Sequence, residues 1–479
     1  MAANRRIEFG DFQTPESLAR DVCRVLRRSR LKPASIFEPT CGIGNLVVAA
    51  FEAFPSATAG FAADLNADYV AATRGRLQTQ PAAVQIEVMQ ANFFQTDWNG
   101  HLATLPDPLL VIGNPPWVNN SQLGAIGGKN LPHKDNAVKL RGIEAITGKS
   151  NFDVSEWMLN ALIDVLAGRR ATLAMLCKTA VARKVLARTW SEQRRVNSAR
   201  MYLIDSLKSF GASVDACLLV CRFGRRATQP TCDVFSSFSA GRPLQQFGFR
   251  DGRLIADTDL YEKWRHLRAT SPVRWRSGIK HDCAKVMELR RHGSRFTNGW
   301  GEVMALEDKF VFPLLKSSQV AAGKTSQTDR WMLVPQQRVG DDTAPIRQQA
   351  PRTWSYLQSH GKCLDRRASS IYRNRPRFSV FGVGDYTFAP WKVAVSGLYK
   401  KLVFRKLGPY AGKPMVLDDT AYFIACRDED EADRVASMLN NGPSHEFLSS
   451  LLFWDAKRPI TAATLGLLDL TQAGLGSSS

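Results

Sequence analysis

Val111-Ile112-Gly113-Asn114-Pro115-Pro116-Trp117 is an apolar run followed by an amide side chain, two prolines and an indole. The run from Leu109 to Ile112 predicts a buried strand. Pro115 and Pro116 have no backbone N–H for a sheet ladder, so the strand must end before them. We therefore expect Asn114 at the carboxyl end of the strand, the edge at which open α/β sheets hold their ligands.

The loop after this strand carries a specific set of hydrogen-bonding groups. Asn114 offers one acceptor and two donors, and the prolyl carbonyls are acceptors held by stiff backbone. Together they can receive both hydrogens of a planar exocyclic amine, while Trp117 stacks on the ring that carries it. We interpret Asn114, Pro115, Pro116 and Trp117 as a catalytic loop that binds an aromatic amine. The alternative is a surface turn with a packed tryptophan.

Composition limits the class of protein. The chain has 479 residues, of which 44% are hydrophobic and 23% charged, and this size suggests two to four domains. No run of 18 apolar residues occurs and residues 1–10 lack a signal-peptide stretch, so we expect neither a membrane span nor export. The nine scattered cysteines predict reduced thiols in a cytoplasmic protein. The seven histidines form no HExxH motif, so no metal is expected.

The charge of the chain indicates an anionic partner. The net charge is +20, which favours nucleic acid over the alternative of mere solubility charge. Residues 351–406 contain 12 Lys or Arg against 2 Asp or Glu, with ten aromatic side chains interleaved. This pattern suits phosphate contacts combined with base stacking or wedging. The basic residues that we predict to contact nucleic acid are Arg373, Arg375, Arg377, Lys392, Lys400 and Lys401.

A glycine-containing loop precedes the catalytic loop in the chain. A short strand over residues 35–37 runs into Glu38-Pro39-Thr40-Cys41-Gly42-Ile43-Gly44-Asn45, and a helix is predicted from 46 to 54. Gly42 and Gly44 permit a tight turn against a ligand. The alternative, a dinucleotide site, would need a third glycine where Val47 stands. Glu38 would repel a pyrophosphate but suits the cationic amino-acid end of S-adenosylmethionine.

The next two strands are also expected to end in ligand-binding side chains. A strand over 58–63 leads to Asp64, which is placed to accept from both ribose hydroxyls. The alternative role for Asp64 is a cap for the helix predicted over 67–77. A strand over 84–89 leads to Asn92, which can bind an adenine edge, with Phe93 or Phe94 against the ring.

The order of elements predicts the domain organisation. Strands and helices alternate as far as the apolar run 216–220, which indicates a mostly parallel α/β sheet with an antiparallel edge. The segment that follows is rich in Ser, Gly and Arg and lacks this regular alternation. We place the domain boundary there, near residue 240. The expected units are 1–240, a second domain over 241–473 and a disordered tail over 474–479. Residues 124–148 are expected to form a mobile loop beside the site that orders on a polyanion.

Taken together, the motifs resemble those of the γ-class N6-adenine DNA methyltransferases of restriction–modification and phage-defence systems. The resemblance covers residues 9–225 well, and the C-terminal half resembles their target-recognition domains most clearly over 370–426. It implies a Rossmann-like class I methyltransferase domain followed by a mixed α+β target-recognition domain. It also implies S-adenosylmethionine as cofactor and methyl transfer to the N6 amine of an adenine flipped out of duplex DNA.

The roles of the family's motifs are carried over residue by residue. Asn114 and the Pro115 carbonyl would hold the target amine, Trp117 would stack on the base, and Phe210 would pack on its other side. Asn92 stands where the family usually has Asp, and its amide oxygen can still accept from the adenine amine. The segment that contains Phe12, Thr14 and Pro15 would close over the methionine end of the cofactor. The residues that would bind the rest of the cofactor are Glu38, Pro39, Cys41, Gly42, Gly44, Asn45, Asp64, Asn92 and Phe93.

Three other functions remain open from the sequence. Asn-Pro-Pro-aromatic loops also occur in enzymes that methylate RNA adenine or a protein glutamine amide, and a catalytically silent DNA-binding subunit could keep the fold. We find no Asp…Glu-x-Lys nuclease cluster, so any cognate restriction endonuclease is expected to be a separate chain.

Overall fold

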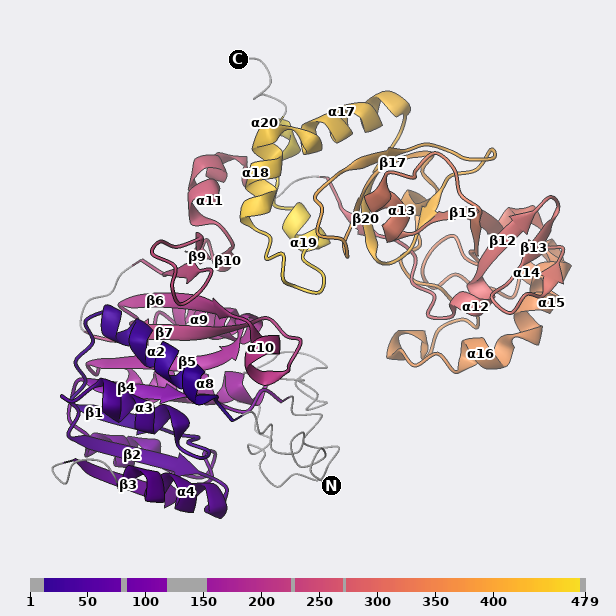
Figure 1. The fold of residues 1–479 in the computed structure, drawn as a ribbon. Helices are drawn as coiled ribbons and strands as arrows, with labels where there is room; N and C mark the ends of the chain where they lie inside the picture. The colour runs from indigo at the N-terminus through magenta and orange to yellow at the C-terminus, as the bar shows by residue number, and fades with distance from the viewer. Residues whose placement is uncertain (1–12, 79–83, 119–152, 225–228, 270–272, 474–479) are drawn as a thin grey trace. The chain divides into compact units, whose positions relative to one another are not determined.

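A computed structural model describes residues 13–78, 84–118, 153–224, 229–269 and 273–473. The chain divides into two compact units, Met1–Thr258 and Asp259–Ser479 (Figure 1). The first unit extends past the boundary expected near residue 240, because two further strands, β9 (Gln245–Arg250) and β10 (Arg253–Ile255), pair with its sheet. Phe12, the loop expected at 124–148 and the tail 474–479 lie outside the described residues.

A twisted sheet forms the frame of the first unit. Among the described residues its strand order is β10-β9-β8-β6-β7-β5-β4-β1-β2-β3. The pairs β1–β2, β1–β4, β2–β3 and β4–β5 are parallel, whereas β7 runs antiparallel between β5 and β6. The strands are β1 Ser35–Glu38, β2 Ala59–Asp64, β3 Gln85–Gln90, β4 Leu109–Gly113, β5 Ala171–Lys178, β6 Ser198–Ile204, β7 Ala216–Arg222, β8 Thr231–Phe235, β9 Gln245–Arg250 and β10 Arg253–Ile255.

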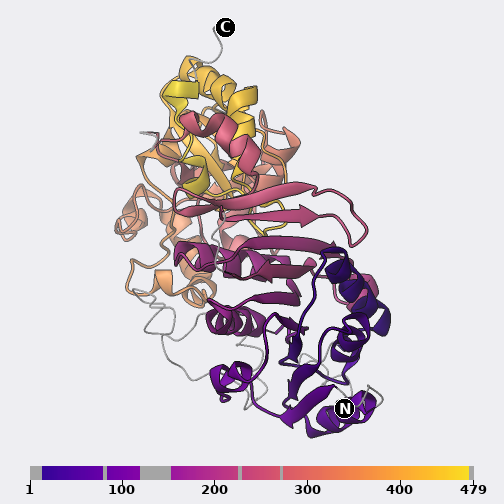
Figure 2. The ribbon, with the colours of Figure 1, turned by 90° about the vertical axis from the view of Figure 1, so that its left-hand side faces the viewer.

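Helices cover both faces of this sheet. Figure 2 shows the indigo helices α2 and α3 on one side and the magenta helices α8 and α9 on the other. Successive strand residues point to opposite faces of the sheet. Ile36 packs with α2 and α3, whereas the ring centroid of Phe37 lies 5.2 Å from that of Trp98. The helices are α2 Glu16–Arg28, α3 Asn45–Ala53, α4 Ala67–Leu77, α5 Trp98–Ala103, α8 Val154–Leu166, α9 Thr179–Ser191 and α10 Ser206–Phe210.

The second unit is mixed α+β. It contains a four-stranded sheet, β11-β20-β17-β18, and a six-stranded sheet, β14-β13-β12-β16-β15-β19. Its strands are β11 Arg276–Ser277, β12 Glu288–His292, β13 Arg295–Thr297, β14 Val303–Met304, β15 Val311–Leu315, β16 Arg330–Leu333, β17 Trp391–Ser396, β18 Arg405–Leu407, β19 Val416–Leu417 and β20 Ala421–Cys426. Its longer helices are α15 Pro351–Ser359, α17 Glu429–Asn440 and α18 Gly442–Ser450.

Short helical segments connect these elements. The α-helical ones are α11 Thr258–Trp264, which begins at the last residue of the first unit, α12 Ala284–Met287, α13 Ser317–Ala322, α14 Ile346–Gln349, α16 Gly361–Asp365, α19 Ala462–Leu465 and α20 Leu470–Ala473. The 3-10 turns are η1 Arg265–Leu267, η2 Asp308–Phe310, η3 Ser370–Tyr372 and η4 Asp385–Phe388. The chain therefore has the predicted organisation, an α/β unit followed by a mixed α+β unit.

Two further features bear on function. No helix within the described ranges is long and apolar enough to cross a membrane. In the same part of the chain, no group of three or more His, Cys, Asp or Glu side chains is arranged to hold a metal ion. All nine cysteines lie in described segments and are free thiols.

Candidate active site

A cavity of about 300 Å³ opens at the carboxyl ends of β1, β2, β3 and β4. Ten of the residues expected to bind cofactor or substrate line it together, although they come from segments as far apart as residues 14 and 116. They are Thr14, Glu38, Pro39, Cys41, Gly42, Asn45, Asp64, Phe93, Asn114 and Pro116. The sheet topology explains this convergence, because parallel strands end at one common edge.

The glycine-containing loop forms one wall of the cavity. Gly42 and Gly44 adopt positive φ values of 51° and 86°, in the left-handed region that favours glycine. A side chain at Gly44 would also collide with Thr73, whose Oγ1 would lie 2.9 Å from the added Cβ. The Thr73 hydroxyl donates to the Gly42 carbonyl at 2.8 Å. Both glycines are thus required by the turn from β1 into α3.

Asp64 ties this loop to the end of β2. Its Oδ2 accepts from the Gly42 N–H at 2.9 Å, and its Oδ1 accepts from the Asn66 N–H at 2.9 Å. Asn66, not Asp64, caps α4, because the Asn66 side chain accepts from the Asp68 N–H. The alternative role for Asp64 as a helix cap therefore does not hold, and its carboxylate lines the cavity.

Glu38 places a buried carboxyl group in the cavity wall. The residue is 1% exposed, and its Oε2 has no hydrogen-bond partner among the described residues. Burial raises the pKa of Glu38 well above its usual range, the Val47 N–H opposes this shift, and nearby Asp64 adds to it. A buried carboxylate without a cation is costly. The cavity therefore has a position suited to a bound cationic group.

Thr14 orients the Asn114 side chain. The Asn114 Nδ2 donates to the Thr14 hydroxyl at 3.2 Å, so Oδ1 is the acceptor that this side chain offers to a ligand. The Thr14 backbone is fixed in turn, because its carbonyl accepts from the Asn45 Nδ2 at 2.7 Å. The helix α2 begins two residues after Thr14, with Pro15 at its cap position and no side-chain cap.

The catalytic loop is anchored where it leaves the cavity. Lys178, at the end of β5, donates to the Trp117 carbonyl at 2.9 Å and forms an ion pair with Asp153 at 2.6 Å. The Val154 N–H donates to the Val118 carbonyl at 2.9 Å. The chain that enters residues 119–152 and the chain that leaves them are therefore joined at one point.

Comparisons with known proteins agree with this geometry. The chain is 44% identical over 466 residues to the type II methyltransferase M.NspV of Nostoc sp. (strain ATCC 29411 / PCC 7524), and the alignment covers 97% of each protein. This chain belongs to the type II methyltransferases. No family model matches it.

The fold of this methyltransferase is also found in a solved structure. The type IIL restriction-modification enzyme MmeI, determined in complex with DNA, matches at a TM-score of 0.54 and 14% identity. The match covers 97% of this chain and 66% of MmeI. The Rossmann-like class I methyltransferase fold expected from the sequence, followed by an additional domain, is confirmed.

Trp117 and Phe210 of this methyltransferase pack against each other. Their ring centroids are 5.0 Å apart at an interplanar angle of 71°, and the Trp117 Nε1 donates to the Leu176 carbonyl at 3.3 Å. Trp117 is only 6% exposed and does not line the cavity. The space expected between the two rings for a base is therefore closed in this conformation.

Asn92 does not take the position expected for it. Its Oδ1 accepts from the Phe94 N–H at 3.0 Å, which closes a local turn, and the residue does not line the cavity. Phe93 and Phe94 do line it, so the aromatic part of the prediction fits the structure. Pro15, Gly44 and Pro115 are also not among the residues that line the cavity.

Sequence reasoning missed several lining residues, among them Gln13, Tyr69, Val154 and Met158. Gln13 accepts from the Ile43 N–H at 3.1 Å and covers Gly42, and Tyr69 lies on the first turn of α4. Val154 and Met158 are one turn apart on α8. Their i, i+4 spacing was a usable signal for a shared face, but it did not indicate which face.

The basic residues predicted to bind DNA fall into three groups. Arg373, Arg375, Lys400 and Lys401 are exposed. Arg377 is exposed but paired with Asp365, with Nη2 2.9 Å from Oδ2. Lys392 is wrong as a surface contact: it is 1% exposed on the central strand β17, where its Nζ donates to the Ala389 carbonyl. Burial lowers the pKa of Lys392 to about 7.

Proposed function

We propose that this chain transfers a methyl group from S-adenosylmethionine to the N6 amine of an adenine flipped out of duplex DNA. The observation that carries the proposal is one cavity that holds both the buried Glu38 carboxyl and the Asn114 amide. The first suits the cationic end of the methyl donor, and the second suits the amine that receives the methyl group.

The residues present fit S-adenosylmethionine. Glu38 would hold the ammonium group, and its unpartnered Oε2 would gain a partner. Asp64 would accept from the ribose hydroxyls. Phe93 and Phe94 offer aromatic faces for the adenine ring, and their centroids lie 5.8 Å apart. When bound, the cofactor supplies an electrophilic methyl group on its sulfonium.

Asn114 and the Pro115 carbonyl activate the acceptor amine in this proposal. The N6 lone pair is delocalised into the adenine ring, so the amine is a poor nucleophile. Two acceptors on its hydrogens favour a tetrahedral nitrogen with the lone pair turned toward the methyl group. These interactions strengthen as the nitrogen–methyl bond forms and the methyl–sulfur bond of the sulfonium breaks, so they stabilise the transition state more than the ground state. The sulfur would leave as a neutral thioether, and the methylated amine would release one proton to water. Holding the amine beside the cofactor adds the advantage of proximity.

The target adenine must leave the helix to reach this loop. Base flipping costs a few kcal/mol, and stacking of the flipped base on an aromatic ring offsets about 1–3 kcal/mol of that cost. Trp117 and Phe210 are the rings available beside the loop. Since they contact each other, Phe210 must move off Trp117 before a base can enter between them.

Duplex DNA is the substrate that the other features favour. The chain carries a net charge of +20, and the four exposed basic residues of the second unit suit phosphate contacts. M.NspV is a type II methyltransferase, and MmeI was solved in complex with DNA. Both relationships support a site-specific DNA methyltransferase, whose cognate endonuclease would be a separate chain.

A methyl-transfer assay tests this proposal. Purified protein is incubated with labelled S-adenosylmethionine and, separately, unmethylated duplex DNA, total RNA and protein extract, followed by nucleoside mass analysis. N6-methyladenine in DNA alone is the expected result. Label only in RNA would show that the substrate is RNA and not DNA. Label only in protein would show that the substrate is not a nucleic acid. Cofactor binding without any transfer would favour a silent DNA-binding subunit.

A further inference from the structure

The hairpin that joins β17 to β18 exposes two large apolar side chains at its tip. Leu398 is 37% exposed and Tyr399 is 46% exposed, and the exposed Lys400 and Lys401 follow them. Among the described residues, no other two consecutive positions are large exposed hydrophobics. The return limb is buried again, with Leu402 at 4% exposure. Apolar exposure is thus confined to the tip.

Buried hydrogen bonds hold the base of this tip. The Ser396 Oγ accepts from the N–H groups of Leu398 and Tyr399 at 3.3 and 3.2 Å. Ser396 is 1% exposed, and its hydroxyl bonds to that of Ser317 at 2.6 Å. Gly397 lies so close to its neighbours that an added Cβ would be 2.7 Å from the Tyr422 ring. The backbone under the two exposed side chains is therefore fixed.

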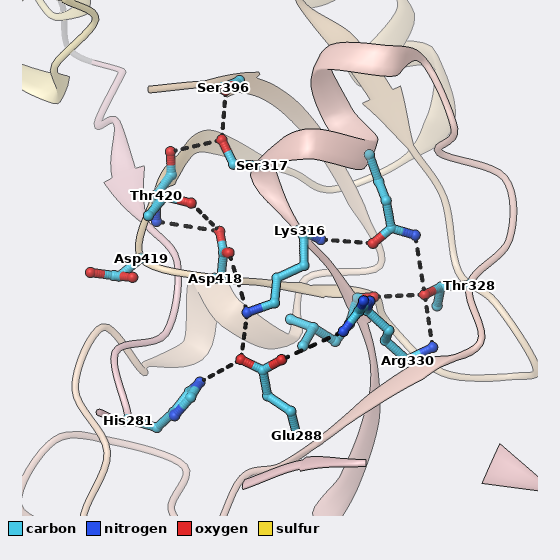
Figure 3. Close-up of polar contacts among 12 residues, drawn as sticks. His281, Glu288, Lys316, Ser317, Thr328, Arg330, Ser396, Asp418, Asp419 and Thr420 are labelled. Atoms are coloured by element: carbon cyan, nitrogen blue, oxygen red, sulfur yellow. Dashed lines mark hydrogen bonds and ion pairs between the residues drawn. The ribbon is translucent and has the colours of Figure 1, made fainter. Parts of the chain in front are cut away.

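The anchoring continues into a network of buried and half-buried charged side chains, which Figure 3 shows. The Ser317 hydroxyl donates to the Thr420 carbonyl at 3.1 Å, and the Thr420 hydroxyl donates to Asp418 at 2.7 Å. Asp418 lies 3.6 Å from the Lys316 Nζ. Lys316 also pairs with Glu288, which accepts a further contact from His281 at 3.1 Å.

Glu288 keeps its charge in this network. Burial raises the pKa of Glu288, but hydrogen bonds from His281 and Lys316 outweigh that effect and bring it to about 2. Glu288 is therefore a carboxylate at neutral pH. A rigid support beneath exposed apolar side chains is typical of a contact surface and not of a frayed loop.

We propose that Leu398 and Tyr399 form a wedge that enters duplex DNA, with Lys400 and Lys401 on the flanking phosphates. This inference rests on the proposed function, because it assigns a role in base flipping to a specific part of the second unit. Lysines beside apolar side chains match the chemistry of a duplex, whose phosphates are anionic and whose base steps are apolar. The wedge separates a base step and so lowers the cost of extruding the target adenine.

Paired substrates test the wedge. The double variant Leu398→Ser, Tyr399→Ser is compared with wild type on the mapped target duplex and on the same duplex with an abasic site opposite the target adenine. The abasic site lowers the cost of extrusion, so a wedge is needed less. Single-turnover methylation by the variant should be at least tenfold slower on the intact duplex and within threefold of wild type on the abasic one.

Matched variants separate the wedge from a general surface effect. Val339→Ser removes another large apolar side chain, 42% exposed, and Tyr399→Phe keeps the ring, so both should stay within threefold of wild type on both duplexes. Lys400→Gln with Lys401→Gln should flatten the salt dependence of DNA binding. Equal melting temperatures would confirm that the variants fold.

Two results would overturn the wedge while leaving the proposed function intact. The first is an equal loss of rate on both duplexes, which would indicate general binding. The second is wild-type speed for the double variant on the intact duplex. If wild-type protein transferred no methyl group to either duplex, the proposed function itself would fail, and the wedge with it.

Discussion

Trp117 and Phe210 meet edge to face, with centroids 5.0 Å apart, although they come from the ends of different strand–loop segments of the sheet. The contact shields the Trp117 ring, which is 6% exposed. A base between two parallel rings needs about 7 Å between their planes, twice the contact distance of stacked carbon atoms. The proposed entry of a base between these rings therefore requires the pair to change its arrangement.

Phe210→Ala should slow methylation of duplex DNA by about 10- to 100-fold, since stacking on one ring contributes about 1–3 kcal/mol. Phe210 does not line the cofactor cavity, so affinity for S-adenosylmethionine should stay within twofold. Single-turnover rates and calorimetric cofactor binding measure the two quantities. A loss of cofactor affinity as large as the loss of rate would show that Phe210 acts on the cavity instead.

Asn114→Ala should lower turnover by about 10²–10³-fold, the usual cost of removing one polar group that acts in the transition state. Cofactor affinity should be nearly unchanged, because the amide is expected to hold the amine and not the methyl donor. Asn114→Asp keeps an oxygen acceptor beside the Thr14 hydroxyl, so it should retain more activity than the alanine variant. Equal inactivity of the two variants would argue against an acceptor role.

Thr14→Val removes the hydroxyl that accepts from the Asn114 Nδ2. We expect kcat to fall about fivefold, corresponding to the roughly 1 kcal/mol of one hydrogen bond, with KM for the cofactor unchanged. Thr14→Ser keeps the hydroxyl and should restore most of the rate. If the serine variant were as slow as the valine variant, the methyl group rather than the hydroxyl would be important.

Glu38→Gln should weaken S-adenosylmethionine binding about 10- to 100-fold, since a hydrogen bond to a charged group contributes about 1.5–3 kcal/mol. In wild type the affinity should also fall as the pH is lowered through the raised pKa of Glu38, so the two proteins should converge at acidic pH. Isothermal titration from pH 5 to 8 measures this. If the affinities of wild type and of the glutamine variant changed with pH in the same way, Glu38 would not be the group that binds the ammonium of the cofactor.

The same substitution should stabilise the cofactor-free protein at neutral pH. The pKa of Glu38 is higher in the folded than in the unfolded chain, so the folded state binds more protons between those two values. Stability therefore falls as the pH rises through that window. Glutamine removes this cost, and the gain in melting temperature should be largest at pH 8 and should vanish near pH 4.

Lys392→Met should raise the free energy of unfolding by about 1–3 kcal/mol at pH 7, because it replaces a buried cation with an apolar side chain of similar volume. The folded-state pKa, about 7, lies below the unfolded value, so wild-type stability is lowest below pH 7 and rises toward pH 10. The difference between the proteins should shrink over that range. Denaturant unfolding measures it, and an unchanged salt slope of DNA binding would confirm that Lys392 does not contact DNA.

Local signals were enough to predict much of the first unit. The helix predicted over 67–77 matches α4, because Asn66 caps it and the apolar positions are regular. The strand before Asn114 matches β4, because five buried residues end at two prolines. The cofactor cavity could be predicted for a related reason: every parallel strand ends at the same edge, so side chains after the strands converge.

Long-range pairing explains what the sequence did not predict. Lys392 follows the alternation of an exposed edge strand, but β18 and β20 pair on both sides of β17 and bury it. Likewise, β9 and β10 join the first sheet only through β8, so the change in composition near residue 240 did not mark the boundary. Thr14 has the sequence features of a helix cap, yet its hydroxyl serves Asn114, a residue distant in the chain.

The junction of Lys178, Asp153 and the Val118 carbonyl has a consequence for changes in chain length. Because the Val154 N–H donates to the Val118 carbonyl at 2.9 Å, the residues on either side of the segment 119–152 are held next to each other. The geometry of Asn114 is thereby uncoupled from the length of the segment at 119–152. We therefore expect a change in the length of that segment to leave the strand that carries Asn114 in place.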